Sequence, residues 1–386
     1  PATGGLTPFS LADQRLAESL ASQAAIALTN RLLLTQLEKL FESFIGLINV
    51  AIDDKSPYTR GHCERVPVLT LMLAEAAAAD AGGRPAVFRM SDQDRYELKI
   101  SGLLHDCGKV TTPVHVVDKA TKLHTLYDRI NTVDTRFEVL KRDAEIEMLK
   151  GLAALRGPAD AQAGAELRTA YETRLAQLES DREFLRRCNI GGETMSDADM
   201  RRVRQIGSAL RWRDAAGRET DFLSADEIEN LTIRAGTLTA AEREIINHHI
   251  VATIKMLEQL PWPRHLRHVP EYAGGHHERM DGKGYPRGLT RGQMSVQARI
   301  MGIADIFEAL TARDRPYKPG KTLSEALFIL GKLKEAGHID PDLFDVFIRR
   351  RVYADYAGKF LEPRQIDSVD ESRIPGYDAG GGPAAA

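Results

Sequence analysis

The chain is poor in cysteine and has no long apolar run. Its three cysteines, Cys63, Cys107 and Cys188, are odd in number and show no metal-ligand spacing. We therefore expect no disulfide framework, and we expect a reducing, cytoplasmic location. No apolar stretch reaches the roughly 18 residues of a membrane span, and no signal-peptide pattern is present, so we expect no membrane insertion.

A strong charge imbalance is also missing. The 386 residues carry a formal net charge of −3, which argues against a globally basic protein that binds nucleic-acid polymers. A local cationic pocket for a phosphate ligand stays open. The hydrophobic content of 43% and the charged content of 28% indicate a soluble globular protein, long enough for two or three domains.

No stretch alternates convincingly in the manner of a β-strand, so we predict an all-α fold. Ser10 can cap a long helix over residues 10–52, which contain no proline. Apolar residues in it recur at alternating steps of three and four, which is typical of a parallel two-stranded coiled coil. The seam consists of Asn30, Leu33, Leu37, Leu40, Phe44, Leu47 and Ala51. An amphipathic helix that packs on its own domain is the alternative.

Residues 121–235 differ in character from the rest. Two apolar stripes at helical spacing, over 130–155 and 167–185, flank the turn-forming residues 156–164. We interpret 121–235 as an inserted antiparallel helical hairpin that projects from the main domain. Its charged outer faces are either solvated surface or a partner-binding surface. After it, Thr239 and Glu242 form a capping box for a helix that carries His248 and His249.

The stretch His105-Asp106-Cys107-Gly108-Lys109 holds an imidazole, a carboxylate and an ammonium within five residues. Neighbouring side chains on a helix diverge by about 100°, so a shared task for His105 and Asp106 requires something that both can reach. A metal cluster fits, because the two oxygens of Asp106 can bridge two cations while His105 offers one nitrogen. Taken alone, the pair is more often a solvated helix end than a metal site.

Further histidines and an aspartate along the chain give this pair its weight. Each could alone be an ordinary surface or core residue. Histidine and carboxylate without thiolate suit iron, manganese, cobalt, nickel or zinc and do not suit a calcium cage. The candidate ligands are His62, His105, Asp106, His249, His276, His277 and Asp305.

In this order the chain resembles the HD-GYP family of cyclic di-GMP phosphodiesterases, within the HD superfamily. The resemblance covers about 54–370 and is interrupted by the insertion. Its motifs are His105-Asp106-x-Gly108-Lys109, His276-His277-Glu278-x-x-Asp281-Gly282-x-Gly284-Tyr285-Pro286, and Asp305 followed by Arg315-Pro316-Tyr317-Lys318. Separately, residues 16–34 resemble the last helix of a GAF sensory domain. A start at Pro1 is expected of a piece of a longer protein.

These resemblances imply a domain order. Residues 1–35 would be the tail of a GAF-like sensor, 36–55 a coiled-coil linker helix, and 56–370 an HD-GYP domain built as a helical bundle. The hairpin would occupy about 121–235 of that domain, and 371–386 would form a disordered tail.

The HD-GYP resemblance also implies two divalent metal ions, with iron or manganese first and nickel, cobalt or zinc as alternatives. One ion would be held by His62, His105, Asp106 and Asp305, and the second by Asp106, His249, His276 and His277. We choose His249 over His248 from its spacing to Met256-Leu257. Some family members hold a third ion on a carboxylate just before the first histidine. Here Tyr58 lies one turn before His62, and the nearest preceding acids are Asp53 and Asp54, which puts a third ion in doubt.

Substrate contacts are carried over in the same way. Lys109, catalytic together with Asp106, would reach a phosphate oxygen or the leaving alkoxide, and Arg315 and Lys318 would hold the second phosphate. The loop Gly284-Tyr285-Pro286 would help to recognise cyclic di-GMP or contact a diguanylate cyclase (GGDEF) partner. The N-terminal helix would form a homodimer.

Three functions are compatible with these residues. The first is hydrolysis of cyclic di-GMP to pGpG under the control of an N-terminal sensor. Further hydrolysis to GMP stays open. The second is a catalytically weak HD-GYP module that binds the nucleotide or docks a partner. The third is an HD phosphohydrolase acting on mononucleotides. The complete ligand set argues against the second, and the Gly-Tyr-Pro loop against the third.

Overall fold

A computed structural model describes residues 9–55, 61–80, 89–157, 160–192, 194–312 and 320–378. Over these residues the chain is built from α-helices and a single two-stranded sheet. The predicted all-α fold is therefore confirmed. Among the described helices, none combines the length and the apolarity that crossing a bilayer requires.

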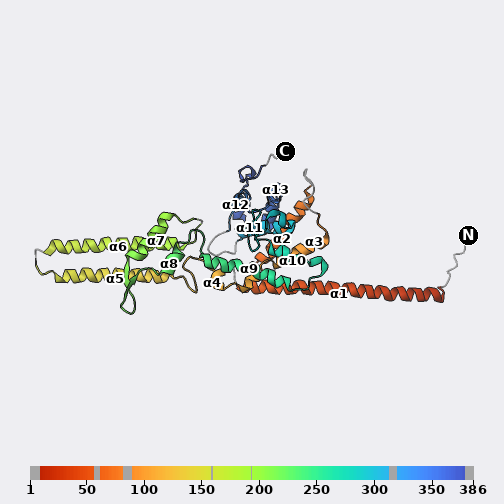
Figure 1. The fold of residues 1–386 in the computed structure, drawn as a ribbon, viewed down its shortest axis with the longest axis horizontal. Helices are drawn as coiled ribbons and strands as arrows, with labels where there is room; N and C mark the ends of the chain where they lie inside the picture. The colour runs from red at the N-terminus through yellow and green to blue at the C-terminus, as the bar shows by residue number, and fades with distance from the viewer. Residues whose placement is uncertain are drawn as a thin grey trace.

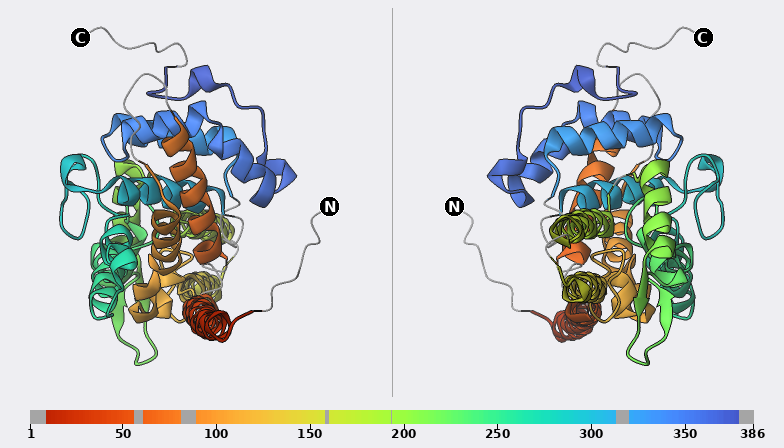
Figure 2. Two further views of the ribbon diagram at one scale, coloured as in Figure 1. Left: turned by 90° about the vertical axis from the view of Figure 1, so that its right-hand side faces the viewer. Right: turned by 90° about the vertical axis from the view of Figure 1, so that its left-hand side faces the viewer.

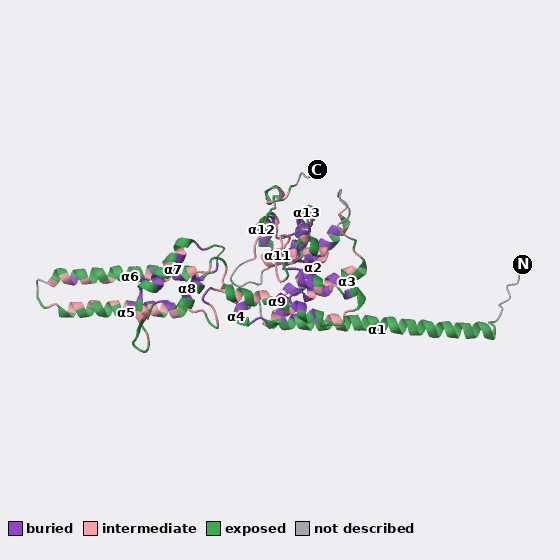
Figure 3. Ribbon diagram, viewed as in Figure 1, coloured by how far each residue is buried: buried purple, intermediate pink, exposed green. Residues whose placement is uncertain are grey.

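Helix α1 (Leu11–Lys55) extends far beyond the rest of the molecule (Figure 1). Ser10 caps it as predicted: its hydroxyl accepts from the Asp13 amide at 3.1 Å, and its own amide donates to the Asp13 carboxylate. Only Ile45, Asn49 and Ile52 are buried, so α1 touches the body through its last third and is exposed elsewhere (Figure 3). It runs along the edge of the body opposite to the C-terminal helices (Figure 2).

The body is a bundle around a core that contains Leu69, Phe307, Phe344 and Phe347. A second cluster joins the end of α1 to α3 and α10. Its helices are α2 (His62–Ala79), α3 (Asp92–Leu104), α4 (Val114–Val117), α9 (Ala240–Glu258), α10 (Val269–Gly274), α11 (Val296–Thr311), α12 (Leu323–Glu335), α13 (Pro341–Arg349) and α14 (Val352–Phe360). Short 3₁₀ turns connect them: η1 (Cys107–Thr111), η3 (Arg264–Leu266), η4 (Arg291–Gln293), η5 (Pro363–Gln365) and η6 (Glu371–Arg373).

Two predicted boundaries are wrong. Helix α3 begins at Asp92, because Ser91 and Asp94 form a capping box. It also ends at Leu104, so that Asp106 lies in the turn before η1 rather than on a helix. The tail was expected to be disordered from residue 371, yet η6 follows and Ile374 is buried against the body core. Residues 379–386 lie outside the described residues.

The insertion is an antiparallel hairpin of α5 (Ile130–Ala154) and α6 (Ala161–Asn189) that projects from the body on the side opposite to α1 (Figure 1). At its base lie α7 (Asp197–Ala209), β1 (Arg211–Arg213), β2 (Glu219–Asp221) and α8 (Ala225–Leu231). These elements share a core of their own with Phe137, Phe184 and Phe222. The insertion is thus a small subdomain rather than a bare hairpin.

The antiparallel pair β1–β2 corrects the expectation that no strand occurs. Trp212 pairs with Thr220, and the strands are joined by a tight turn. Asp214 accepts from the amides of Ala216 and Arg218 at 2.9 Å, while Gly217 adopts a φ of 78°. A three-residue strand is too short to show a clear alternation in sequence, although Asp214 and Gly217 are turn residues.

Candidate metal centre

Asp106 lies at the centre of the site, and its two carboxylate oxygens face different partners. Oδ2 lies 3.3 Å from Nε2 of both His62 and His105. Oδ1 lies 3.3 Å from Nε2 of His249. One carboxylate therefore connects two groups of histidines from distant parts of the chain.

The first group comes from α2, the end of α3 and α11. His62, His105 and Asp106 offer three ligand atoms that all lie within 4.8 Å of one another. Asp305 of α11 joins them, since its Oδ1 lies 3.2 Å from Nε2 of His62 and 3.7 Å from Nε2 of His105.

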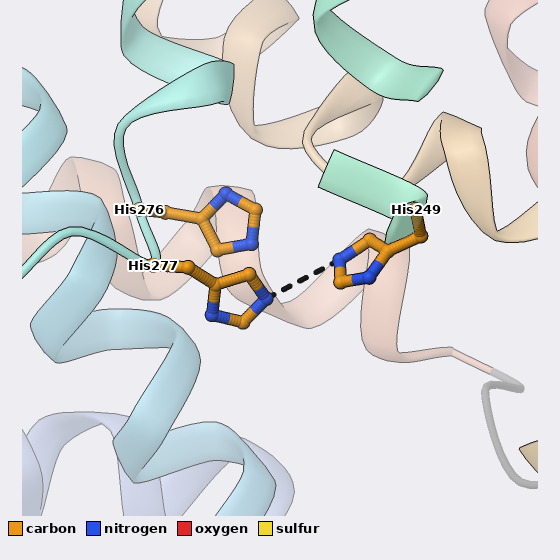
Figure 4. Close-up of side chains that lie close together, drawn as sticks. All are labelled: His249, His276 and His277. Atoms are coloured by element: carbon orange, nitrogen blue, oxygen red, sulfur yellow. Dashed lines mark hydrogen bonds between the residues drawn. The ribbon is translucent and has the colours of Figure 1, made fainter. Parts of the chain in front are cut away.

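The second group consists of His249 of α9 and the adjacent His276 and His277 after α10 (Figure 4). Nε2 of His277 lies 3.2 Å from Nε2 of His249. His248 is exposed, whereas His249 is buried. The structure thus brings together all seven candidate ligands named from the sequence.

The outer ring nitrogens fix how four of these histidines point. Nδ1 of His105, His249 and His276 each donates to a backbone carbonyl three residues earlier, at 2.7, 2.5 and 2.7 Å. Nδ1 of His62 instead pairs with the buried carboxylate of Glu308. Because a carbonyl can only accept, Nδ1 carries the proton in the first three rings, and the Nε2 lone pair is directed inward.

The donor set fits divalent metal ions. Asp106 Oδ1 and His276 Nε2 are buried and have no hydrogen-bond partner among the described residues. Buried polar atoms normally have a partner, and a metal ion is one that both atoms can share. Imidazole nitrogens with carboxylate oxygens and no thiolate suit first-row transition metals.

The electrostatics of the site favour bound positive charge. Burial opposes ionisation of Asp106 and Asp305. Lys109 and His105 nevertheless hold the pKa of Asp106 well below its usual range, and the imidazoles of His105 and His62 do the same for the pKa of Asp305. Burial likewise opposes protonation of His105, yet the Asp106 carboxylate raises its pKa to about 9. In His276, burial and the charge of His105 lower the pKa to about 4. The first group therefore attracts cations, and His276 stays neutral as a ligand must.

Gly108 holds the Asp106 turn against α9. Its amide donates to the Thr253 hydroxyl at 2.9 Å. A Cβ at this position would lie 2.0 Å from the His249 carbonyl oxygen and 2.5 Å from the Thr253 amide nitrogen. Only glycine lets η1 approach α9 so closely, and this approach sets Asp106 beside His249.

The Gly284-Tyr285-Pro286 loop covers the second group. The Tyr285 ring stacks on His277 with centroids 4.8 Å apart and planes at 24°. Buried Glu278 fastens the loop by accepting from the amides of Arg287 and Leu289 at 2.7 and 2.8 Å. Gly284 is needed for close approach, since a Cβ there would lie 2.3 Å from the Arg279 amide nitrogen.

The structure describes some of the other residues that the sequence singled out, but not all of them. Lys109 is largely buried, and its ammonium lies 2.5 Å from Asp106 Oδ2. Arg315, Lys318 and Tyr58 lie outside the described residues. Asp53, considered for a third ion, accepts from the Gly61 amide at 3.2 Å, next to His62.

Glu308 was missed from the sequence. It lies one turn after Asp305 on α11 and is 1% exposed. Besides His62, it binds the Nε of Arg65 at 2.7 Å. The three-residue spacing from Asp305 places both acids on one face of the helix, which is the signal that could have revealed it.

Residues 223–343 match the HD domain family. This part of the chain is therefore similar to HD domains. The match includes His249, His276, His277 and Asp305 and begins inside the predicted insertion. Apart from the start of the tail, the domain boundaries proposed from the sequence stay predictions.

Curated relatives of the HD domain carry related names. A 3'3'-cGAMP-specific phosphodiesterase of Vibrio cholerae is 46% identical over 21% of this chain and 19% of its own length. Cyclic di-GMP phosphodiesterases of Pseudomonas aeruginosa and Thermotoga maritima are 35% and 34% identical, over 30% and 31% of this chain and 27% and 32% of theirs. The chain thus spans less than a third of the length of these relatives. Their names confirm the predicted HD-GYP resemblance, whereas the GAF-like segment stays a prediction.

Proposed function

We propose that this protein is a metal-dependent phosphodiesterase that hydrolyses cyclic di-GMP to pGpG, with GMP as a possible second product. The observation that carries the proposal is the Asp106 carboxylate, whose two oxygens face two separate histidine groups. A bridging carboxylate between two sets of nitrogen ligands is the arrangement that a pair of metal ions requires.

We assign the first ion to His62, His105, Asp106 and Asp305, and the second to Asp106, His249, His276 and His277. Two such ions, iron or manganese by preference, would supply an activated water near neutral pH and offset charge on the phosphoryl oxygens. A third ion stays in doubt: Oδ2 of Asp53 accepts from the Gly61 amide, whereas its Oδ1 is buried with no hydrogen-bond partner among the described residues.

The chain's own residues would orient the substrate. Lys109 is close enough to Asp106 to place a positive charge beside a phosphate at the same centre. Tyr285, stacked on His277, offers an aromatic edge to the ligand. Arg315 and Lys318 remain our candidates for the second phosphate.

We propose 3'3'-cGAMP as a second candidate substrate. The relative that is 46% identical is named a 3'3'-cGAMP-specific phosphodiesterase. That dinucleotide shares the phosphodiester ring and differs in one base, so the metal centre alone would not discriminate between the two. A catalytically weak binding module remains the alternative to both.

The test compares the double variant His105→Ala with Asp106→Ala against the parent chain. We expect the variant to lose bound metal, measured by elemental analysis, and to lose hydrolysis of cyclic di-GMP and 3'3'-cGAMP, measured by chromatography. His248→Ala, an exposed neighbour of His249, is the control and should keep both. Turnover by a correctly folded double variant would refute the proposal.

We further propose that an N-terminal sensor controls the site through a homodimer of α1. The end of α1 contacts the catalytic turn, where the Lys55 ammonium donates to the carbonyl oxygens of Val110 and, at 3.5 Å, Lys109. A movement of α1 would therefore reach η1, the turn that follows Asp106. A diguanylate cyclase partner at the Gly-Tyr-Pro loop is part of the same proposal, as is a reducing cytoplasm, which suits three free cysteines.

A further inference from the structure

The inserted subdomain contains a cavity of about 340 Å³ between the end of α6 and α7. None of its lining residues belongs to the histidine groups. Its volume lies in the range of small-molecule pockets. Four cationic side chains line it, against one carboxylate: Lys122, Arg187, Arg202 and Arg234 against Asp199.

Lys122 is a buried ammonium whose charge is not balanced. It is 2% exposed, and its Nζ donates to the carbonyl oxygens of Leu231 and Ile233 at 3.1 and 2.7 Å and to the sulfur of Met195 at 3.3 Å. These three acceptors, two carbonyl oxygens and one thioether sulfur, carry no net charge, so none of them balances the ammonium. Burial of an unpaired charge is costly and lowers the pKa of Lys122. An anion in the cavity would supply the missing countercharge.

The arginines divide into two that are paired and one that is not. Arg202 binds Asp181 at 3.1 Å, and Arg234 binds Asp197 at 2.6 Å. Arg187 forms no ion pair with the described residues, and its guanidinium lies 6.0 Å from the centre of the Phe184 ring. It is therefore available for bidentate contact with a phosphate group.

We propose that this cavity binds a mononucleotide, with its phosphate between Lys122 and Arg187. Because Arg202 and Arg234 already pair with Asp181 and Asp197, the charge that attracts a phosphate monoester comes from Lys122 and Arg187. The side chains of Ile190 and Met195 give the base an apolar wall. The Asp199 carboxylate can accept from an amino group or a ribose hydroxyl. Each part of a nucleotide thus has a partner in the lining, and the site is independent of the function of the metal centre.

Cys188 provides a local reporter, because it lines the cavity and is partly exposed while Cys63 and Cys107 are buried. The full chain is titrated separately with GMP and with inorganic phosphate, and alkylation of Cys188 is followed by peptide mass spectrometry. We expect GMP to slow alkylation with saturation, in the presence and absence of a chelator. Binding at the metal centre would not protect this thiol.

Arg187→Gln should raise the GMP concentration for half-protection by at least about tenfold. The matched control is Arg213→Gln, an exposed arginine of the same subdomain that does not line the cavity. Lys122→Met, if folded, should also weaken protection. Protection unchanged in Arg187→Gln, or no protection in the parent chain, would overturn the site. Equal protection by phosphate and GMP would overturn its assignment to a nucleotide.

Discussion

Glu308 illustrates how a residue that no substrate need touch can control a metal site. Its carboxylate holds Nδ1 of His62 on one side and Arg65 on the other, and all three side chains are at least 85% buried. Such a partner fixes the orientation of a ligand ring and raises its basicity. Within the described part of the chain, Nδ1 of His62 pairs with this carboxylate, whereas Nδ1 of His105, His249 and His276 donates to a backbone carbonyl.

Glu308→Gln should therefore weaken metal binding by about 10–100-fold, because the amide keeps the size of the side chain but loses its charge. Competition with a chelator measures the affinity. Glu75→Gln serves as the control, since Glu75 forms an exposed ion pair with Arg95 on the surface of α2. Equal affinities in the two variants would show that Glu308 only supports the fold.

Gly108 is a second residue whose role is set by contact distance. Gly108→Ala should push η1 away from α9, destabilise the protein by about 1–3 kcal/mol and separate Asp106 from His249. Urea unfolding and metal titration test the two effects. Gly292→Ala, where a Cβ would meet nothing within 4 Å, should change neither. If Gly108→Ala changed neither the free energy of unfolding nor metal binding, η1 could move away from α9 without cost, and the proposed role of Gly108 would be wrong.

The seven candidate ligands could be named from the sequence because residue type and order are enough to mark them. Their supporting residues could not. Glu308 and Thr253 are ordinary helical residues, and their partners lie 246 and 145 positions away in the chain. Only the packing of α11 on α2 and of α9 on η1 reveals what they contact. The carbonyl acceptors of Gly102, Ile246 and Ala273 carry no residue-type signal at all.

At the scale of elements, α1 has two different faces. The face with Ile45, Asn49 and Ile52 packs on the body. The predicted seam lies elsewhere on the helix, and Leu33, Leu37, Leu40, Phe44 and Leu47 are each 53–63% exposed. So much exposed apolar surface along one stripe favours pairing with a second copy.

Leu37→Glu should therefore shift the protein from dimer to monomer, because it places a charge in the centre of the seam. Sedimentation analysis over a range of protein concentrations measures the change. Thr35→Glu introduces the same side chain at an exposed position two residues away, outside the seam, and should remain dimeric. If the parent chain is itself monomeric, or both variants dimerise equally, the seam does not mediate association.

Element boundaries show where sequence patterns are strong. Thr239 and Glu242 were recognised as a capping box, and the structure has both of its hydrogen bonds. Ser91 with Asp94 and Ser224 with Glu227 are boxes of the same kind that the sequence reading passed over. The small elements at the base of the hairpin were hidden because the long apolar stripes of α5 and α6 dominated the pattern of residues 121–235.

At the scale of the whole molecule, a buried lysine connects the inserted subdomain to the HD body. The Lys119 ammonium is fully buried and donates to Asn230 of α8 at 2.7 Å and to both oxygens of Glu242 at the start of α9 at 2.7–2.8 Å. Since α9 carries His249, this contact links the insertion to the helix that bears a candidate ligand. Burial opposes ionisation of Glu242, but the bond from Lys119 lowers its pKa overall.

A lowered pKa in the folded state means that the contact stabilises the protein above the unfolded pKa and is lost as pH falls through the folded value. Lys119→Met should therefore cost about 1–3 kcal/mol near neutral pH. The difference from the parent chain should shrink between about pH 5 and pH 3. Urea unfolding at several pH values measures it. Lys255→Met, on an exposed part of α9, is the control and should show no such trend. A difference that stays constant with pH would show that Lys119 acts through packing alone, and not through its charge on Glu242.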